Sequence, residues 1–189
     1  MTWHIPSEEK NLYLTFDDGP IPVITPWVLE TLHEYNASAT FFCVGENAKK
    51  HPDIMEKLKD SKHTIGNHTM NHLNGWKTQN EKYYSNINEC KKHIQSDLFR
   101  PPYGKIKITQ MNFLKKEFRI IMWDVLSRDY DTSISGESCF ENVKQNASAG
   151  SIIVFHDSIK AEERLRIALP ATLKYFSELG FSFKAIKFN

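Results

Sequence analysis

Short apolar runs alternate along this chain with longer segments whose apolar residues recur at helical spacing. The short runs predict strands at residues 12–16, 39–44, 63–66, 98–100, 119–123, 151–155 and 181–186. The longer segments predict helices that begin at Thr25-Pro26 and Pro52, and helices at residues 46–50, 78–94, 108–117, 140–147 and 162–178. Such alternation indicates an α/β fold, in which helices cover about seven parallel strands that form a barrel or an open sheet.

The totals are those of an ordinary soluble chain, and we expect one domain over residues 1–189. Hydrophobic residues make up 40% and charged residues 25%, and the net charge of +1 gives no indication of a nucleic-acid partner. No run is long enough for a membrane span, and residues 1–6 lack a secretory signal, so the chain as given indicates a cytoplasmic protein but leaves the compartment open. We also expect a monomer. Its cysteines, Cys43, Cys90 and Cys139, are expected to be buried free thiols.

Polar clusters follow five of the predicted strands. They are Asp17-Asp18, residues 67–72, residues 100–104, Asp124 with residues 127–130, and residues 156–158. In barrels and in open parallel sheets, the working groups lie beyond the carboxyl ends of the strands. We therefore expect these clusters to share one rim of the fold.

Asp17 and Asp18 stand at the tip of the first predicted strand and precede Gly19-Pro20. Successive side chains of an extended segment point apart, so the two carboxylates can perform two different tasks from one place. An aspartate followed by glycine also has a purely structural explanation as a turn. The other clusters on the rim favour the functional interpretation.

His68 and His72 are four residues apart, and on a helical turn this spacing places both imidazoles on one face. They could equally be surface or capping histidines. Two imidazoles and one carboxylate leave open coordination positions, which is typical of a catalytic metal, and zinc is expected first. The same ligands suit a non-haem iron oxygenase, but those enzymes usually have all-β folds, unlike this alternating chain.

The remaining polar groups complete a hydrolytic set. If Asp18 binds the metal, Asp17 is free to act as the general base on an activated water, and Arg100 can keep that base ionised. His156 can act as the general acid. Taken alone, Arg100 could be a structural salt bridge and His156 a strand-end histidine bonded to a backbone carbonyl. No glycine-rich phosphate loop is present, so the set favours hydrolysis of an acyl compound over nucleotide chemistry.

Four stretches of the sequence resemble successive motifs of the polysaccharide deacetylases, the NodB-homology domains of carbohydrate esterase family 4. These stretches are Thr15-Phe16-Asp17-Asp18-Gly19-Pro20, His68-Thr69-Met70-Asn71-His72, Arg100-Pro101-Pro102-Tyr103-Gly104 and Ile153-Val154-Phe155-His156-Asp157. The resemblance implies a distorted (β/α) barrel with about seven strands. It also implies removal of N-acetyl or O-acetyl groups from chitin, peptidoglycan or xylan with one divalent metal, usually zinc.

The resemblance implies a role for each residue that matches a motif position. The implied metal ligands are Asp18, His68 and His72. The implied catalytic groups are Asp17 as base, Arg100 as its brace, the backbone N–H of Tyr103 as oxyanion donor, and His156 as general acid. The implied substrate-binding residues are Tyr130 and Val154, which resemble the tryptophan and leucine that line the acetyl-methyl pocket. Tyr103 and Trp123 are also expected to bind substrate.

One motif departs from the family pattern, because Leu126 stands where many relatives carry an aspartate that orients the acid histidine. Asp124 or Asp129 could take over that task, or the acid role of His156 is weakened. We expect a metal-dependent N-deacetylase whose partner is an acetylated glycan, such as chitin oligomers or peptidoglycan. The alternatives are O-acetylated xylan, another small N-acyl compound, or a glycan-binding protein with weakened turnover.

Overall fold

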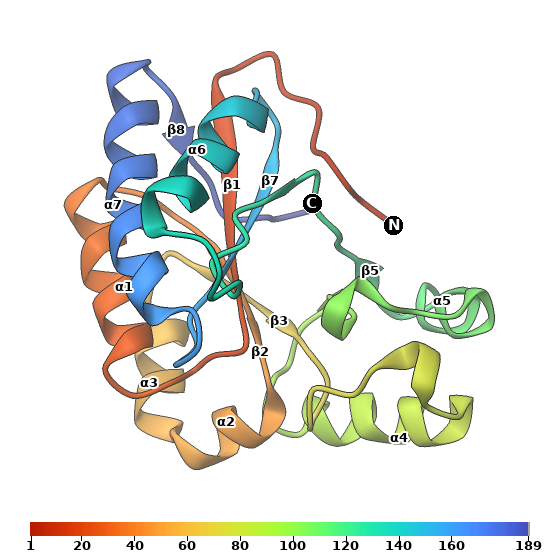
Figure 1. Ribbon diagram of the computed structural model, residues 1–189. Helices are drawn as coiled ribbons and strands as arrows, with labels where there is room; N and C mark the ends of the chain where they lie inside the picture. Colours follow the sequence, from red (N-terminus) through yellow and green to blue (C-terminus); the bar gives the residue numbers. More distant parts are fainter. Residues whose placement is uncertain (189) are drawn as a thin grey trace.

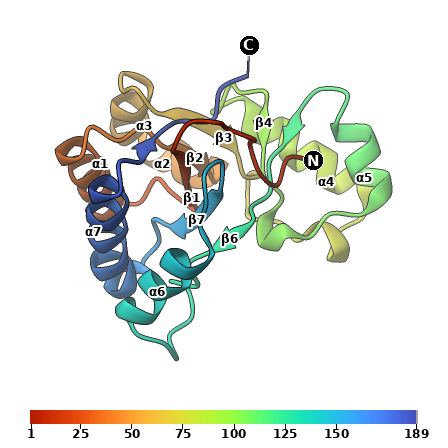
Figure 2. The same cartoon turned by 90° about the horizontal axis from the view of Figure 1, so that it is seen from above.

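The computed structural model describes residues 1–188, and within them eight parallel strands form one curled sheet. The sheet order is β5-β4-β3-β2-β1-β7-β6, and β8 pairs with the start of β1. The strands are β1 Asn11–Asp17, β2 Thr40–Cys43, β3 Thr64–Asn67, β4 Leu98–Phe99, β5 Arg119–Ile120, β6 Val125–Leu126, β7 Ile152–His156 and β8 Ser182–Phe183. Seen from above, helices surround the sheet on its outside (Figure 2). The predicted distorted (β/α) barrel is confirmed.

The helices lie in two groups around the sheet. They are α1 Ile24–Glu34, α2 Gly45–Lys50, α3 Pro52–Lys59, α4 Asn80–Lys91, α5 Ile108–Leu114, α6 Gly136–Asn146 and α7 Glu162–Glu178, with 3-10 turns η1 Gly75–Lys77 and η2 Pro102–Gly104. In both views α1, α6 and α7 lie on the side of β1 and β7, whereas α4 and α5 lie at the opposite end (Figures 1 and 2). Over residues 1–188, no helix has both the length and the apolar character that a bilayer crossing requires.

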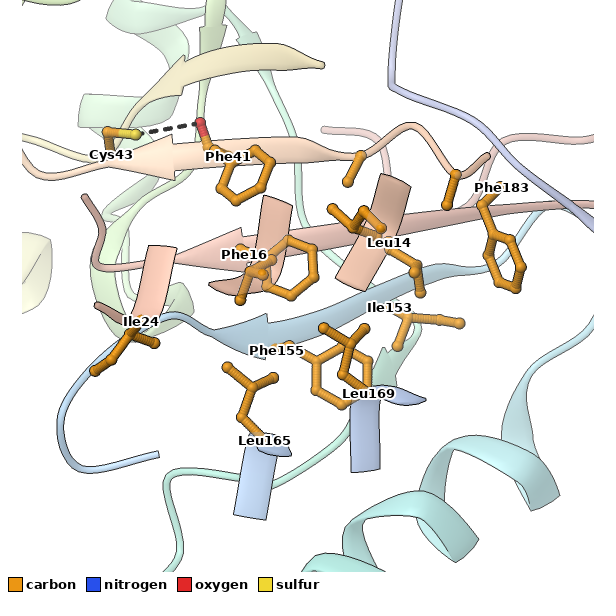
Figure 3. Close-up of a cluster of buried hydrophobic side chains, with 14 of the residues drawn as sticks. Leu14, Phe16, Ile24, Phe41, Cys43, Ile153, Phe155, Leu165, Leu169 and Phe183 are labelled. Carbon is orange, nitrogen blue, oxygen red and sulfur yellow. Dashed lines mark hydrogen bonds between the residues drawn. The ribbon is translucent and has the colours of Figure 1, made fainter. Parts of the chain in front are cut away.

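The main core is built around β1, which pairs with β2, β7 and β8. Phe16 is fully buried, and its ring stacks on Phe41 of β2 at 5.0 Å and on Phe155 of β7 at 6.1 Å between centroids. Leu165 and Leu169 of α7 complete this cluster (Figure 3). Truncating a buried phenylalanine costs about 3–5 kcal/mol, so the packing of Phe16 against β2 and β7 stabilises the three adjacent strands beneath the rim.

Several predicted boundaries shift. The first helix begins at Ile24, and Thr25 is not its cap. Instead the buried Thr25 hydroxyl accepts a hydrogen bond from the Ile21 N–H and donates one to Asp157. The helix predicted at 140–147 begins earlier, at Gly136, because Ser135 caps it through the Ser138 N–H.

The predicted strand at 119–123 is wrong in extent, and β6 was not predicted. Only Arg119–Ile120 pairs with β4, and the chain then crosses to the other side of the sheet, where Val125–Leu126 pairs with β7. The crossing residues Ile121 and Met122 are buried like strand residues. Their carbonyl oxygens, however, accept hydrogen bonds from the side chain of Arg100.

Candidate active site

The carboxyl ends of the strands meet around one pocket, as the sequence predicts. Asp17 ends β1 directly beside His156, the last residue of β7, and β3 ends just before His68. The pocket has a volume of about 430 Å³. Its lining residues are Asp17, Asp18, His68, His72, Tyr103, Lys105, Trp123, Leu126, Tyr130, Val154, His156 and Lys160. Five segments distant in sequence therefore supply one cavity.

Asp18, His68 and His72 form a group that suits a metal ion, with ligand atoms that all lie within 4.8 Å of one another. The Asp18 Oδ1 atom is 3.1 Å from His72 Nε2 and 3.9 Å from His68 Nε2. This oxygen is buried and has no hydrogen-bond partner in the described residues. A buried carboxylate oxygen without a donor, facing two imidazole nitrogens, fits a small divalent cation.

The histidine orientations suit the same interpretation. His68 Nδ1 lies 2.8 Å from the carbonyl oxygen of Arg100, and His72 Nδ1 lies 3.1 Å from the hydroxyl of Tyr103. Each contact leaves the Nε2 atom directed at Asp18, and in metal sites a hydrogen bond to the other ring nitrogen orients a histidine ligand in this way. Burial lowers the pKa of His68 to about 4, so its imidazole is neutral and available as a ligand near pH 7.

Asp18 is held as a carboxylate by its neighbours. Burial raises its pKa, but the close contact with the His72 imidazole and the electrostatic attraction of His156, His68 and His72 outweigh burial and bring the value to about 2. A cation would find this ligand already ionised.

The two histidines do not lie on a helical turn, so the helical explanation of their spacing is wrong. Residues 68–72 form an irregular loop in which Thr69 and His72 have positive φ angles of 64° and 54°. Asn67 Oδ1 accepts a hydrogen bond from the Thr69 N–H at 2.9 Å, and this contact supports the turn. The imidazole rings still meet, with centroids 5.0 Å apart.

Left-handed backbone recurs around the pocket. Besides the two residues of the histidine loop, Asp18, Tyr103 and Arg128 have φ angles of 86°, 62° and 65°. This backbone conformation is energetically unfavourable for residues other than glycine, and such residues cluster at functional sites. The strained backbone conformations of these loops are therefore consistent with a role in orienting the side chains of the pocket.

Asp17 is paired with a fully buried arginine. Arg100 Nη1 donates to Asp17 Oδ1 at 2.8 Å, and the guanidinium also donates to Thr15 Oγ1 and to the carbonyls of Ile121 and Met122. Burial lowers the pKa of Arg100, while the charge of Asp17 and its hydrogen bond oppose that effect. The second carboxylate oxygen of Asp17 faces the metal group, 3.9 Å from His68 Nε2.

His156 is oriented by Asp129, the second of the two carboxylates considered above. Asp129 Oδ1 lies 2.7 Å from His156 Nδ1, and Asp129 Oδ2 accepts the His156 N–H at 2.7 Å. Burial lowers the pKa of His156, but the charge of Asp129, its hydrogen bond and the charges of Asp17 and Asp18 raise it to about 9. Its imidazole is therefore a cation near pH 7.

Asp124 lies elsewhere, outside the pocket lining. Its carboxylate accepts hydrogen bonds from the Ser151 hydroxyl and the Ile152 N–H, and it lies 2.8 Å from His4 Nδ1. These contacts tie the N-terminal segment to the start of β7. The geometry gives Asp124 a structural position rather than a contact with His156.

Apolar and aromatic side chains form the walls of the pocket, namely Tyr103, Trp123, Leu126, Tyr130 and Val154. The Tyr130 ring meets His156 edge-on at 5.3 Å, and the Tyr103 ring packs against His72 at 4.5 Å. The residue that departs from the family pattern, Leu126, thus lies in the wall, while Asp129 contacts the histidine. The structure brings every sequence-predicted site residue to this rim except Asp124.

Three residues that lie at this site, Lys105, Lys160 and Asp157, have no role that the sequence predicts. Lys105 and Lys160 line the pocket, and nothing in the sequence separates them from ordinary solvated lysines. Asp157 is fully buried, and its carboxylate accepts hydrogen bonds from the Gly19 N–H at 3.0 Å and the Thr25 hydroxyl at 2.5 Å. Burial raises its pKa to about 8, against the effect of those hydrogen bonds. Asp157 clamps the turn that carries Asp18.

Known proteins with similar sequences are deacetylases that act on glycans. Residues 4–117 match the family model described as Polysaccharide deacetylase. A peptidoglycan-N-acetylglucosamine deacetylase of Bacillus cereus is 34% identical over 98% of this chain and 91% of the relative. A chitooligosaccharide deacetylase of Azorhizobium caulinodans is 36% identical over 84% of this chain and 79% of the relative.

A solved structure shows the same fold. The crystal structure of the Bc1960 peptidoglycan N-acetylglucosamine deacetylase, in complex with 4-naphthalen-1-yl-N-oxidanyl-benzamide, has a TM-score of 0.92 and 30% identity. The alignment covers 98% of this chain and 90% of that chain. The barrel, the rim pocket and these relatives define a hydrolase that deacetylates glycans. The chain belongs to the polysaccharide deacetylase family, as its motifs indicate.

Proposed function

We propose that this protein is a zinc-dependent deacetylase that removes N-acetyl groups from N-acetylglucosamine units of a glycan. One observation carries the proposal: a carboxylate and two imidazoles that fit a cation share a 430 Å³ pocket with a separate paired carboxylate and a separate cationic histidine. The sequence relatives named as N-acetylglucosamine and chitooligosaccharide deacetylases support the choice of substrate.

Asp18, His68 and His72 would hold the metal, because their donor atoms converge and the Asp18 oxygen lacks a partner in the described residues. An oxygen and two nitrogen donors with open positions suit catalytic zinc. When bound, a divalent cation supplies Lewis acidity, which lowers the pKa of water and polarises a carbonyl group.

Asp17 acts as the general base in this proposal. Arg100 occupies Asp17 Oδ1 and fixes the orientation of the carboxylate, and Asp17 Oδ2 is left on the pocket side to take a proton from the attacking water. The backbone N–H of Tyr103 stabilises the charge that develops on the carbonyl oxygen. Its unusual φ angle of 62° supports a functional orientation of this peptide group.

His156 acts as the general acid. Asp129 binds the Nδ1 atom, so the proton available to the leaving nitrogen is the one on Nε2. A pKa of about 9 keeps this proton in place near neutral pH. This contact argues against the alternative of a binding protein with lost turnover, because that alternative depends on His156 lacking a carboxylate partner.

The test compares acetate release and metal content in matched variants. Asp17→Asn is expected to abolish acetate release from chitin oligomers and peptidoglycan fragments while one zinc per chain remains bound. His68→Ala is expected to lose both. Full activity of Asp17→Asn would remove Asp17 as the base, and acetate release from small non-sugar amides alone would replace the glycan with another N-acyl substrate.

A further inference from the structure

Two lysines flank the candidate active site on opposite sides. Lys105 follows β4 and η2, and Lys160 follows β7, and both line the pocket. In the sheet order, β4 and β7 lie on opposite sides of β1, which supplies Asp17 at the floor. A ligand whose reacting unit sits over Asp17 and Asp18 would therefore meet one ammonium group on either side.

Neither ammonium group has a carboxylate partner among residues 1–188, although other lysines of the chain do. Lys91, Lys92 and Lys144 each pair with a glutamate. In contrast, Lys105 Nζ lies 5.4 Å from the centre of the Trp76 ring, and Lys160 Nζ lies 6.0 Å from the centre of the Tyr130 ring. An aromatic face attracts an ammonium group without neutralising its charge.

The charges below the rim do not neutralise these lysines either. Asp17 is already paired with Arg100, and the positive charge of His156 offsets the negative charge of Asp18 near neutral pH. The lining thus carries an excess of positive charge, and charged walls of one sign attract oppositely charged substrate groups.

Glycans differ sharply in what they offer to this arrangement. A chitin oligomer is neutral along its whole length. In a peptidoglycan strand, each N-acetylglucosamine is flanked by sugars that bear a 3-O-lactyl group or the peptide attached to it, and both substituents carry carboxylates. Such carboxylates lie on either side of the reacting unit, as the two lysines do.

We propose that Lys105 and Lys160 form a carboxylate-binding subsite that selects acidic glycans over neutral ones, an inference that rests on the proposed deacetylase function. Each lysine pairs with a carboxylate on a sugar that flanks the reacting unit. The Trp76 and Tyr130 rings hold the two ammonium groups at the rim in the absence of substrate.

The experiment compares three tetrasaccharides as substrates: a peptide-free muramic-acid-containing fragment, its methyl ester, and chitotetraose. An exposed ion pair contributes up to about 1 kcal/mol, so Lys105→Ala/Lys160→Ala is expected to lower kcat/KM roughly tenfold on the free acid. The neutral ester and chitotetraose should be unaffected. The Lys105→Arg/Lys160→Arg variant keeps both charges and should restore activity on the acid.

A matched control removes two exposed lysines outside the pocket lining, as Lys174→Ala/Lys184→Ala, and changes the net charge equally. This control should leave all three substrates unaffected. A peptide-bearing fragment distinguishes the two sources of carboxylate, because its lactyl group is blocked as an amide. If the double alanine variant loses kcat/KM only on the peptide-bearing fragment, the lysines bind the peptide carboxylates. If it loses kcat/KM only on the free acid, the lysines bind the lactyl carboxylate.

Binding to the Asp17→Asn variant separates this inference from the proposed function. If the wild-type protein releases no acetate, the deacetylase proposal fails, but the affinities of the acid and of chitotetraose still decide the subsite. Tighter binding of the acid that disappears with the two lysines supports the subsite. Equal losses on acidic and neutral glycans, or no loss on either, would overturn it.

Discussion

Replacing Asp129 with asparagine should remove the charge that keeps His156 protonated while leaving a side chain of the same shape. In the wild type, Asp129 contacts both Nδ1 and the backbone N–H of His156 at 2.7 Å. The substitution retains one acceptor for those contacts but deletes the negative charge. The pH dependence of catalysis is therefore the property that should change most.

The size of the effect follows from the pKa of His156, which stands at about 9 against an ordinary value of 6.5. At 1.36 kcal/mol per pKa unit, this difference corresponds to about 3 kcal/mol in favour of the imidazolium. Without the Asp129 charge, burial is opposed only by the charges of Asp17 and Asp18, so the pKa of His156 should fall. If it returns to about 6.5, roughly a tenth of His156 is protonated at about pH 7.5. The kcat/KM value there should then fall about tenfold.

The assay is a pH profile of kcat/KM for acetate release, from about pH 6 to about pH 10. In the wild type the alkaline limb should fall through about pH 9, and in Asp129→Asn it should move to below about pH 7. Asp131→Asn is the matched control, since it removes a carboxylate from the same loop that contacts Arg128 and Ser133 instead. An unchanged alkaline limb in Asp129→Asn would refute the acid role of His156.

The same charge should appear in the free energy of unfolding. A pKa raised in the folded state stabilises the fold fully below the unfolded value of about 6.5, and this stabilisation is lost as pH rises through about 9. The stability gap between wild type and Asp129→Asn should therefore be widest, at about 3 kcal/mol, on the acid side. Urea titrations at both ends of that window measure it.

Three further outcomes follow from the contacts of the site. Arg100→Met should destabilise the fold by about 3–5 kcal/mol in urea titrations, because it leaves the Asp17 charge buried and unpaired; a loss below about 1 kcal/mol would contradict this reasoning. Gly19→Ala should disrupt the site, because the added Cβ would lie 2.0 Å from Asp157 Oδ2, and an undisturbed melting temperature and activity would disprove that clash. Zinc at about a hundredfold excess over its dissociation constant should stabilise the wild type by about 2.7 kcal/mol but leave His72→Ala unchanged, as thermal melts would report.

The alternating pattern was sufficient to predict a parallel sheet covered by helices, whereas the distorted barrel was implied by the family resemblance. The reason that the pattern succeeds is clearest in β1 and α7. The buried run of β1 and the long apolar stripe of α7 are set by their own sequences, and the last helix spans the predicted residues Glu162–Glu178. The run at 119–123 misled because burial alone does not make a strand. Two of its carbonyls bond to Arg100, a contact that no periodicity reveals.

At the candidate site, too, the sequence predicts some features and the tertiary structure decides others. Motif order brought the two acids and the histidine pair to one rim, but the choice between Asp124 and Asp129 depended on the course of the loop after β6. There the backbone turns at Arg128, with φ of 65°, and brings the Asp129 side chain back to His156. The sequence does not indicate that Arg128 adopts a left-handed backbone conformation. It therefore cannot decide whether Asp124 or Asp129 contacts His156.

The positive φ angles around the pocket imply that substitutions which raise thermostability at these positions would lower catalytic activity. At Tyr103, Arg128 and His72, glycine would relieve the backbone of roughly 1–2 kcal/mol. A selection for heat resistance alone should therefore enrich glycine at these positions, and the survivors should melt later yet deacetylate poorly. Engineers who want a robust catalyst from this scaffold should add rigidity on the outer helices and leave the rim loops alone.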